Sequence, residues 1–267
     1  MPFRTAAALV AGLVLAACAP ATDASPASPG APTQLVVFGA ASLRVALAEA
    51  ANTYVAANAG VTIAVATDSS ATLATQVEQG APVDVFLSAD TVNPARLADA
   101  GLAAADPVAF ATNGLAVIVP AGNPAGLTSP ADLARPGLRV IAAGDEVPIT
   151  RYAAELVANL GAQPGYPARF ADAYAANILS REDNVAAILA KVELGEGDAA
   201  IVYATDAAAS RRVEALEVPA RARVAATYAG VVLRDARHPA AAASFLAWLA
   251  GPGGRAVLEP LGFGPAP

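Results

Sequence analysis

The sequence predicts an α/β protein in which mainly parallel sheets, flanked by helices, are divided between two hinged lobes. Segments with the pattern of buried strands alternate with segments of helical periodicity along the body of the chain. Two of the strands, at residues 35–38 and 61–66, run directly into turns that carry serines and open helices. Two extended stretches, at residues 110–114 and 225–230, are candidates for crossings between the lobes.

The predicted elements follow one another in strand–helix order. After the first strand, Leu43, Leu47 and Tyr54 mark one face of a helix at helical spacing. Leu73 and Val77 do the same in the second helix, which Gly80 closes. Further strands are expected at 83–87, 115–119, 138–142, 199–203 and 227–233. Further helices are expected at 92–100, 150–160, 184–194, from 205, at 239–249, and in a short last segment before Pro260.

The two crossings set the expected lobe boundaries. If both cross, lobe I comprises residues 34–112 plus 230–267, and lobe II comprises residues 113–229. An inserted second lobe makes a hinged body with a cleft, and in an open α/β sheet ligands gather at the carboxyl ends of strands, where helices start.

The N-terminal residues have the pattern of an export signal. Residues 1–17 combine one positive charge with a short apolar stretch, too short for a spanning helix. The signal ends in Leu15-Ala16-Ala17-Cys18, which resembles the lipobox of bacterial lipoproteins. We therefore expect lipidation of Cys18, with ordinary cleavage near Ala17 as the alternative. Residues 18–33 are rich in Ala, Pro, Ser and Thr and would tether the body to a membrane. The expected location is the periplasm or the outer face of the cytoplasmic membrane.

Composition excludes several classes of protein. The 267 residues carry a formal net charge of −7, and no basic cluster is present to neutralise nucleic-acid phosphates. A single cysteine rules out a disulfide within the chain. Glu193, Glu196 and Asp198 are expected to form a solvated acidic turn.

The two strand-to-helix turns have the chemistry of an anion site. Each places a serine hydroxyl and free backbone N–H groups at a helix start, in Gly39-Ala40-Ala41-Ser42-Leu43 and in Asp68-Ser69-Ser70-Ala71-Thr72. From spacing alone, the N-cap of a helix is the favoured role for Ser42 and for Ser70. Ser69 fits a cap or a supporting hydroxyl. Tyr203, at the end of the strand 199–203, fits a core tyrosine or a hydroxyl donor.

Together with these turns, several further motifs give the chain a family resemblance. They are Gly80-Ala81-Pro82-Val83-Asp84-Val85-Phe86, Gly144-Asp145-Glu146-Val147-Pro148, Ile201-Val202-Tyr203 and Leu261-Gly262-Phe263. Over about residues 34–264 the chain resembles the periplasmic molybdate-binding proteins, the substrate receptors of molybdate ABC importers. This resemblance implies the two-lobe fold of type II solute-binding proteins and a monomer that delivers molybdate, or tungstate, to an ABC permease.

The resemblance also implies a ligand set without catalytic residues, cofactor or bound metal ion. In the family, two serines, two backbone amides and one tyrosine hydroxyl hold the oxyanion. Carried over by motif, the serines are Ser42 and Ser70, the amides belong to Ile149 and Val185, and the hydroxyl belongs to Tyr203. Molybdate carries no proton at neutral pH and needs only donors, which these neutral groups supply.

Two positions depart from the family pattern. Ile149 stands where members often have alanine, which matters little if only its N–H contacts the ligand. Asp68 stands where a small residue is usual. A carboxylate beside a dianion lowers affinity unless it faces away or caps the helix.

Other functions stay open at this point. A different tetrahedral oxyanion such as sulfate would suit the same donors, whereas a ferric-ion receptor would need paired tyrosines that are missing. A serine hydrolase is disfavoured, because Gly-x-Ser-x-Gly is absent and the single histidine, His238, cannot readily complete a triad. The effector domain of a transcription regulator is disfavoured by the export signal. We therefore expect a binding protein rather than an enzyme.

Overall fold

The computed structural model describes residues 32–267. The predicted signal peptide 1–17, the lipidation site Cys18 and the tether up to residue 31 lie outside the described residues. The first strand begins at Thr33, one residue before the expected start of the body. Among the described residues, no helix combines the length and the apolar character needed to cross a membrane.

The described strands form one continuous sheet, in the order β2-β1-β3-β9-β4-β7-β5-β6, with β8 paired to β4. Pairing is parallel within β2-β1-β3 and within β6-β5-β7, and antiparallel wherever β4, β8 or β9 takes part. The strands are β1 (Thr33–Ala40), β2 (Val61–Asp68), β3 (Val85–Ser88), β4 (Val108–Pro120), β5 (Val140–Ala143), β6 (Ile178–Glu182), β7 (Ala199–Tyr203), β8 (Val213–Leu216) and β9 (Ala225–Val232).

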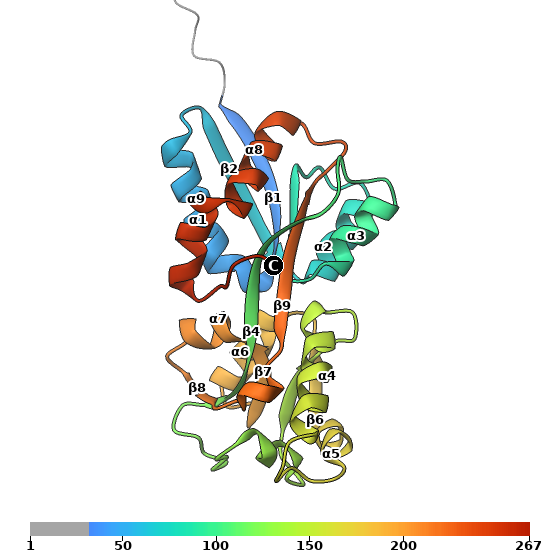
Figure 1. Cartoon of the computed structure of the whole chain (residues 1–267), viewed down its shortest axis with the longest axis vertical. Helices are drawn as coiled ribbons and strands as arrows, with labels where there is room; N and C mark the ends of the chain where they lie inside the picture. Colours follow the sequence, from blue (N-terminus) through green and yellow to red (C-terminus); the bar gives the residue numbers. More distant parts are fainter. Residues whose placement is uncertain (1–31) are drawn as a thin grey trace, which may run out of the picture. The chain divides into compact units, whose positions relative to one another are not determined.

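Helices cover both faces of the two parallel groups of strands (Figure 1). Lobe I denotes the elements around β1, β2 and β3, and lobe II those around β5, β6 and β7. The helices of lobe I are α1 (Arg44–Ala57), α2 (Ser70–Glu78), α3 (Val92–Asp99), α8 (Pro239–Ala250) and α9 (Pro252–Leu258), with a 3-10 turn η1 (Ala41–Leu43) ahead of α1. Those of lobe II are α4 (Pro148–Gly161), α5 (Phe170–Ala176), α6 (Val185–Glu193) and α7 (Ala204–Ala209).

The first strand shows why this sequence forms a sheet between helices. Leu35 and Val37 point to one face and pack in the main hydrophobic cluster, to which α1 and α8 contribute. Val36 and Phe38 point to the other face and pack in a second cluster with α2 and α3. Alternate side chains of a strand point to opposite faces, so a strand apolar at every position is covered on both sides.

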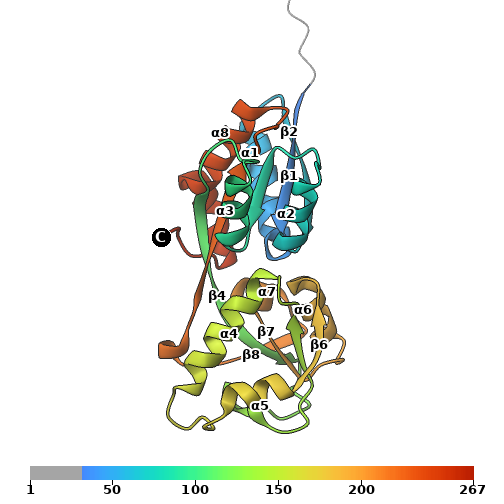
Figure 2. The ribbon, with the colours of Figure 1, turned by 90° about the vertical axis from the view of Figure 1, so that its right-hand side faces the viewer.

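Two long strands link the lobes. The first part of β4 pairs with β9, from Val108↔Gly230 to Gly114↔Ala225. From Leu115 onward the same strand pairs with β7 and then with β8. Figure 2 shows β4 and β9 running side by side between the two groups of helices. The predicted crossings at 110–114 and 225–230 lie within these two strands.

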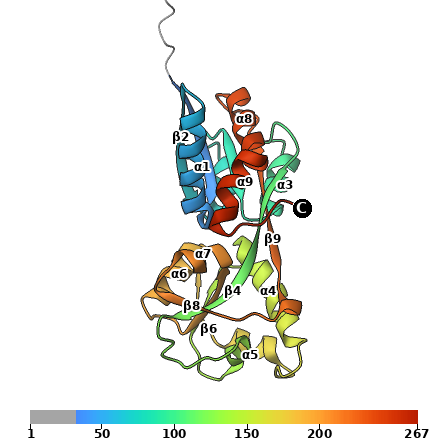
Figure 3. The ribbon, with the colours of Figure 1, turned by 60° about the vertical axis from the view of Figure 1, so that its left-hand side comes forward.

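Three elements were not predicted: α5, β6 and β8. β6 alternates half-buried and exposed residues at one end of the sheet, and β8 pairs only with β4. Short edge strands carry mixed polar residues and therefore give a weak sequence signal. Figure 3 shows β6 and β8 in lobe II, below α6 and α7.

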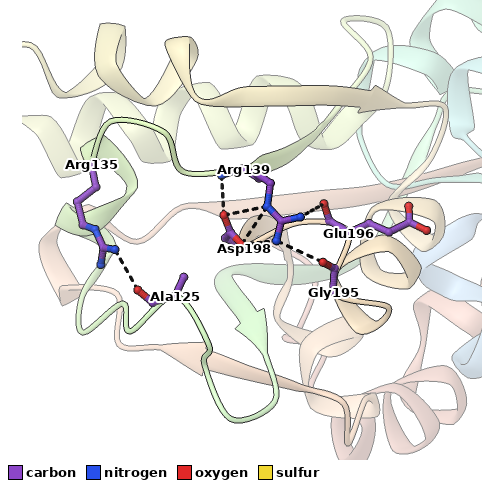
Figure 4. Close-up of polar contacts among 6 residues, drawn as sticks. All are labelled: Ala125, Arg135, Arg139, Gly195, Glu196 and Asp198. Atoms are coloured by element: carbon purple, nitrogen blue, oxygen red, sulfur yellow. Dashed lines mark hydrogen bonds and ion pairs between the residues drawn. The ribbon is translucent and has the colours of Figure 1, made fainter.

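The expected solvated acidic turn is only partly solvated. The side chain of Asp198 is 15% exposed and accepts hydrogen bonds from the Arg139 guanidinium at 2.6 Å and from the Arg139 backbone N–H at 2.9 Å (Figure 4). Burial by itself raises the pKa of Asp198, but the hydrogen bonds from Arg139 outweigh burial and the pKa is lowered. The Arg139 guanidinium also donates to the carbonyls of Gly195 and Glu196, which fixes this turn against β5.

Candidate functional site

A small cavity lies where residues of both lobes meet, and four of the five predicted site residues line it. They are Ser42 and Ser70 from lobe I and Val185 and Tyr203 from lobe II. The free volume is about 10 Å³, which is room for about one water molecule. The fifth predicted residue, Ile149, is not among the lining residues, although its neighbours Val147 and Pro148 are.

The Ser42 hydroxyl belongs to a hydrogen-bonded chain that reaches both linking strands. Its oxygen lies 2.8 Å from the Tyr228 hydroxyl on β9, and the Asn113 side-chain amide on β4 donates to the same Tyr228 oxygen at 3.3 Å. Because Tyr228 accepts from Asn113, its own proton is available for the oxygen of Ser42. The Ser42 proton is then free to point into the cavity.

The Ser70 hydroxyl is likewise held through its oxygen, which leaves its proton free. Ser70 is the first residue of α2 and its oxygen accepts a hydrogen bond from the backbone N–H of Ala89 at 3.1 Å. Neither Ser42 nor Ser70 occupies the N-cap position of an α-helix, since Leu43 stands at that position of α1 and Ser69 at that of α2. The alternative role of these two serines as helix caps is therefore wrong.

Lobe II contributes two helix N-termini. Pro148 is the first residue of α4 and Val185 is the first residue of α6. Amides in the first turn of a helix have no partner within the helix, and the helix dipole adds partial positive charge there. The Asn184 side chain caps α6 by accepting from the N–H of Ala187 at 3.0 Å, so the amides of Val185 and Ala186 are left for other acceptors.

Ile149 is the second residue of α4, and only its backbone can serve the cavity. Its side chain is 2% exposed and lines a separate cavity of about 250 Å³ inside lobe II, together with Val157 and Ile201. The Ile149 N–H belongs to the first turn of α4, beside Val147 and Pro148. The contact between this amide and a ligand remains a prediction.

Tyr203 closes the cavity from the end of β7. The residue is 2% exposed, and its hydroxyl is buried without a hydrogen-bond partner. Burial, with smaller effects from nearby groups such as Tyr228 and Tyr152, raises the pKa of Tyr203 well above its usual value. The phenol therefore keeps its proton and can only gain by donating it to an acceptor.

Asp68 is not among the lining residues, but its carboxylate bonds to two residues that are. Its Oδ1 accepts from the Ser69 backbone N–H at 2.7 Å and from the Asn184 side-chain amide at 2.9 Å. Asp68 belongs to lobe I and Asn184 to lobe II, so this second bond joins the lobes beside the cavity. Asp68, the residue that departs from the family pattern, therefore forms a contact between the lobes and does not line the cavity.

Asn113, Tyr228 and Asn184 were not predicted as part of the site. Asn113 and Tyr228 fall in the two predicted crossing segments, and that was the only signal of their role.

A buried carboxylate lies behind the site. Asp206 lines a larger cavity of about 340 Å³ together with Ser42, Arg44 and Glu193, and its Oδ2 atom is buried without a partner. Burial raises the pKa of Asp206 to about 7, although Arg44 and a hydrogen bond from the backbone of Tyr203 oppose the shift. Within residues 32–267, no group of three or more His, Cys, Asp or Glu side chains is placed to hold a metal ion.

Comparison with known proteins assigns the family. The model of the bacterial extracellular solute-binding proteins matches residues 35–264, which is nearly the whole described chain. The protein belongs to this family. The molybdate-binding protein ModA of Mycobacterium tuberculosis is 39% identical to it over 262 residues, 96% of this chain and 94% of that protein.

Solved structures show the same two-lobe fold. The Azotobacter vinelandii periplasmic molybdate-binding protein superimposes with a TM-score of 0.72 at 22% identity, over 86% of this chain and 98% of that one. The sulfate-binding protein SubI of M. tuberculosis superimposes with a TM-score of 0.75 at 20% identity, over 87% of each chain. This solute-binding protein thus has the two-lobe α/β fold that the sequence predicts.

Proposed function

We propose that this protein binds molybdate, and tungstate, outside the cytoplasm and delivers the oxyanion to an ABC importer. The observation that carries the proposal is the convergence on one cavity of uncharged donors from both lobes: the hydroxyls of Ser42, Ser70 and Tyr203 and the amides of first helical turns. The 39% identity to a ModA protein over nearly the whole chain supports molybdate over other solutes.

The donor set suits a dianion that carries no proton. The oxygens of Ser42 and Ser70 are hydrogen-bonded to protein groups, and the Tyr203 hydroxyl has no partner. All three hydroxyls can therefore donate a proton to an acceptor in the cavity. Hydrogen bonds to an ionised acceptor are about twice as strong as neutral ones. Within the lining, no lysine or arginine is present, and the helix N-termini of α2, α4 and α6 supply the positive potential.

Binding requires the lobes to separate and close again. A cavity of about 10 Å³ has no room for a tetrahedral oxyanion, and its walls come from both lobes. The walls must therefore move apart to admit the ion, and contacts from both lobes to one ligand then favour a closed form around it. We place the hinge in β4 and β9 and the lobe boundaries at 34–112 plus 230–267 and 113–229.

The proposal extends to the cellular setting. Residues 1–17 would direct export, and a lipid on Cys18 would hold the monomeric receptor at the periplasmic or outer face of the membrane, near its permease. We propose no catalytic role. His238, the single histidine of the chain, stands at the N-cap of α8, and its backbone N–H donates to Asp84, outside the cavity.

Titration calorimetry with molybdate, tungstate, sulfate and phosphate tests this function. We expect binding of molybdate and tungstate, and a loss of about tenfold or more in affinity for Ser42→Ala and for Tyr203→Phe, since each removes one charge-assisted hydrogen bond. Ser244→Ala, on the exposed face of α8, is the matched control and should bind as the unaltered protein does. Unchanged affinity in both site variants would refute these roles, and preferential binding of sulfate would reassign the ligand.

A further inference from the structure

A third serine in the cavity has an unexplained hydroxyl. Ser69 is 3% exposed, lines the cavity beside Ser70, and occupies the N-cap position of α2. A serine at this position normally accepts a hydrogen bond from an N–H of the first turn. The Ser69 side chain makes no such bond, and its Oγ is buried with no partner at all. Capping therefore does not explain this serine.

The hydroxyls of Ser42 and Ser70, which line the same cavity, differ from that of Ser69. The Ser42 oxygen is bonded to Tyr228 and the Ser70 oxygen accepts from Ala89, so both hydroxyls are anchored to the protein. Ser69 shares its state with Tyr203: both hydroxyls are buried without a partner, both line the same cavity, and they come from opposite lobes. Leaving a buried hydroxyl unbonded is unfavourable, so an acceptor that enters this cavity would satisfy both at once.

The Ser69 hydroxyl makes no hydrogen bond to a protein acceptor, and its nearest polar neighbours bond to other groups. The Oδ1 of Asp68 already accepts from the Ser69 backbone and from Asn184, and the Asn184 carbonyl oxygen accepts from Ala187. A tetrahedral dianion has four oxygens, each able to accept more than one hydrogen bond, so it has capacity for donors beyond the five implied by the family resemblance.

We propose that Ser69 is a further ligand of the oxyanion and donates its hydroxyl proton to it from lobe I. This inference rests on the proposed function and adds a donor to it. In the ligand-bound form Ser69 and Tyr203 would hold the ion from opposite walls, and the helix α2 would contribute two consecutive hydroxyls, Ser69 and Ser70.

The test is Ser69→Ala, followed by two measurements. Calorimetry should show about tenfold or more weaker binding of molybdate, because one hydrogen bond to an ionised acceptor is lost. Urea unfolding of the ligand-free variant should show an unchanged or higher midpoint, because the variant loses an unpaired hydroxyl rather than a cap. Ser69→Thr keeps the hydroxyl and should retain most of the affinity.

Ser210→Ala is the matched control, since the Ser210 hydroxyl donates to Glu193 at 2.7 Å and accepts from the Arg212 backbone N–H at 3.1 Å, and Ser210 does not line the cavity. It should lower the urea midpoint and leave molybdate affinity unchanged. If Ser69→Ala behaves like Ser210→Ala, or binds molybdate as tightly as the unaltered protein, Ser69 is not a ligand. In that case the proposed function still stands, provided that the unaltered protein binds molybdate; if the unaltered protein binds neither molybdate nor tungstate, both proposals fall.

Discussion

At the scale of single residues, the direction of hydrogen bonds decides what the site can bind. Asn113 donates to Tyr228, which leaves the Tyr228 proton for Ser42, and Ala89 donates to Ser70. With this arrangement the oxygens of Ser42 and Ser70 accept from protein donors, and their protons are free to donate to an acceptor in the cavity. A site arranged in this way favours an anion that carries no proton.

The sequence predicts which residues form the site, but it does not predict the hydrogen-bond partners that orient their hydroxyl groups. The serine and tyrosine positions followed from motifs in strand-to-helix turns and at a strand end. The hydrogen-bonded chain that anchors the Ser42 hydroxyl comes from β4 and β9, more than 70 residues from Ser42 in the sequence. No local pattern reports contacts of that separation, so Asn113 and Tyr228 could be recognised only in the folded structure.

Asp206 gives a prediction about pH. Its pKa is raised from an ordinary 3.8 to about 7, so between these values the folded protein keeps a proton that the unfolded chain releases. Stability from this group is therefore greatest at low pH and is lost as pH rises toward 7 and above. Between pH 5 and pH 8 we expect the free energy of unfolding to fall by about 2–3 kcal/mol relative to Asp206→Asn.

Urea unfolding of both proteins at the two pH values measures this difference. Arg44 and Glu193 line the same cavity, and both are unchanged in the variant, so their effects cancel in the comparison. Parallel pH dependence of the two proteins would show that Asp206 titrates normally in the folded state.

At the scale of elements, the starts of α2 and α6 are tied together across the lobes. Asp68 precedes the cap of α2, Asn184 caps α6, and the hydrogen bond between their side chains is 2.9 Å long. Since each helix start contributes lining residues, Ser70 and Val185, this bond aligns the two walls of the cavity when the lobes are closed.

We therefore expect Asp68→Ala to speed the release of molybdate by about three- to tenfold, the loss of one hydrogen bond to a charged group, with little change in the association rate. Asp68→Asn is the matched variant, because its carbonyl oxygen can still accept from Ser69 and Asn184. It should release molybdate at close to the normal rate. Stopped-flow fluorescence measures both rates, and equal release from Asp68→Ala and the unaltered protein would rule out the interlobe bond as a contribution to closure.

The elements also show where prediction from sequence stops. The strands β1, β3, β5 and β7 were predicted because burial on both faces leaves a continuous apolar run in each of them. The short strands β6 and β8 were not predicted, because each has only four or five residues and two of these are exposed. Helices with a clear apolar face, such as α4, were predicted, whereas the seven-residue α5 was not.

At the scale of the whole molecule, the two lobes are joined by a pair of strands that are themselves hydrogen-bonded. β4 and β9 pair antiparallel along the linking segment, and the polar chain from Asn113 to Tyr228 and Ser42 starts on these strands. Ligand contacts and hinge strands therefore belong to one hydrogen-bonded network. Movement of the lobes about β4 and β9 necessarily displaces Ser42 relative to Tyr203.

The central claim is that neutral hydrogen-bond donors of both lobes enclose one tetrahedral dianion. A crystal structure of the protein grown with tungstate tests it most directly, because the heavy atom locates the ion without ambiguity. We predict the ion between the lobes, with its oxygens about 2.6–3.1 Å from the hydroxyls of Ser42, Ser70 and Tyr203. An ion bound at any other place, or serine side chains turned away from it, would contradict the account.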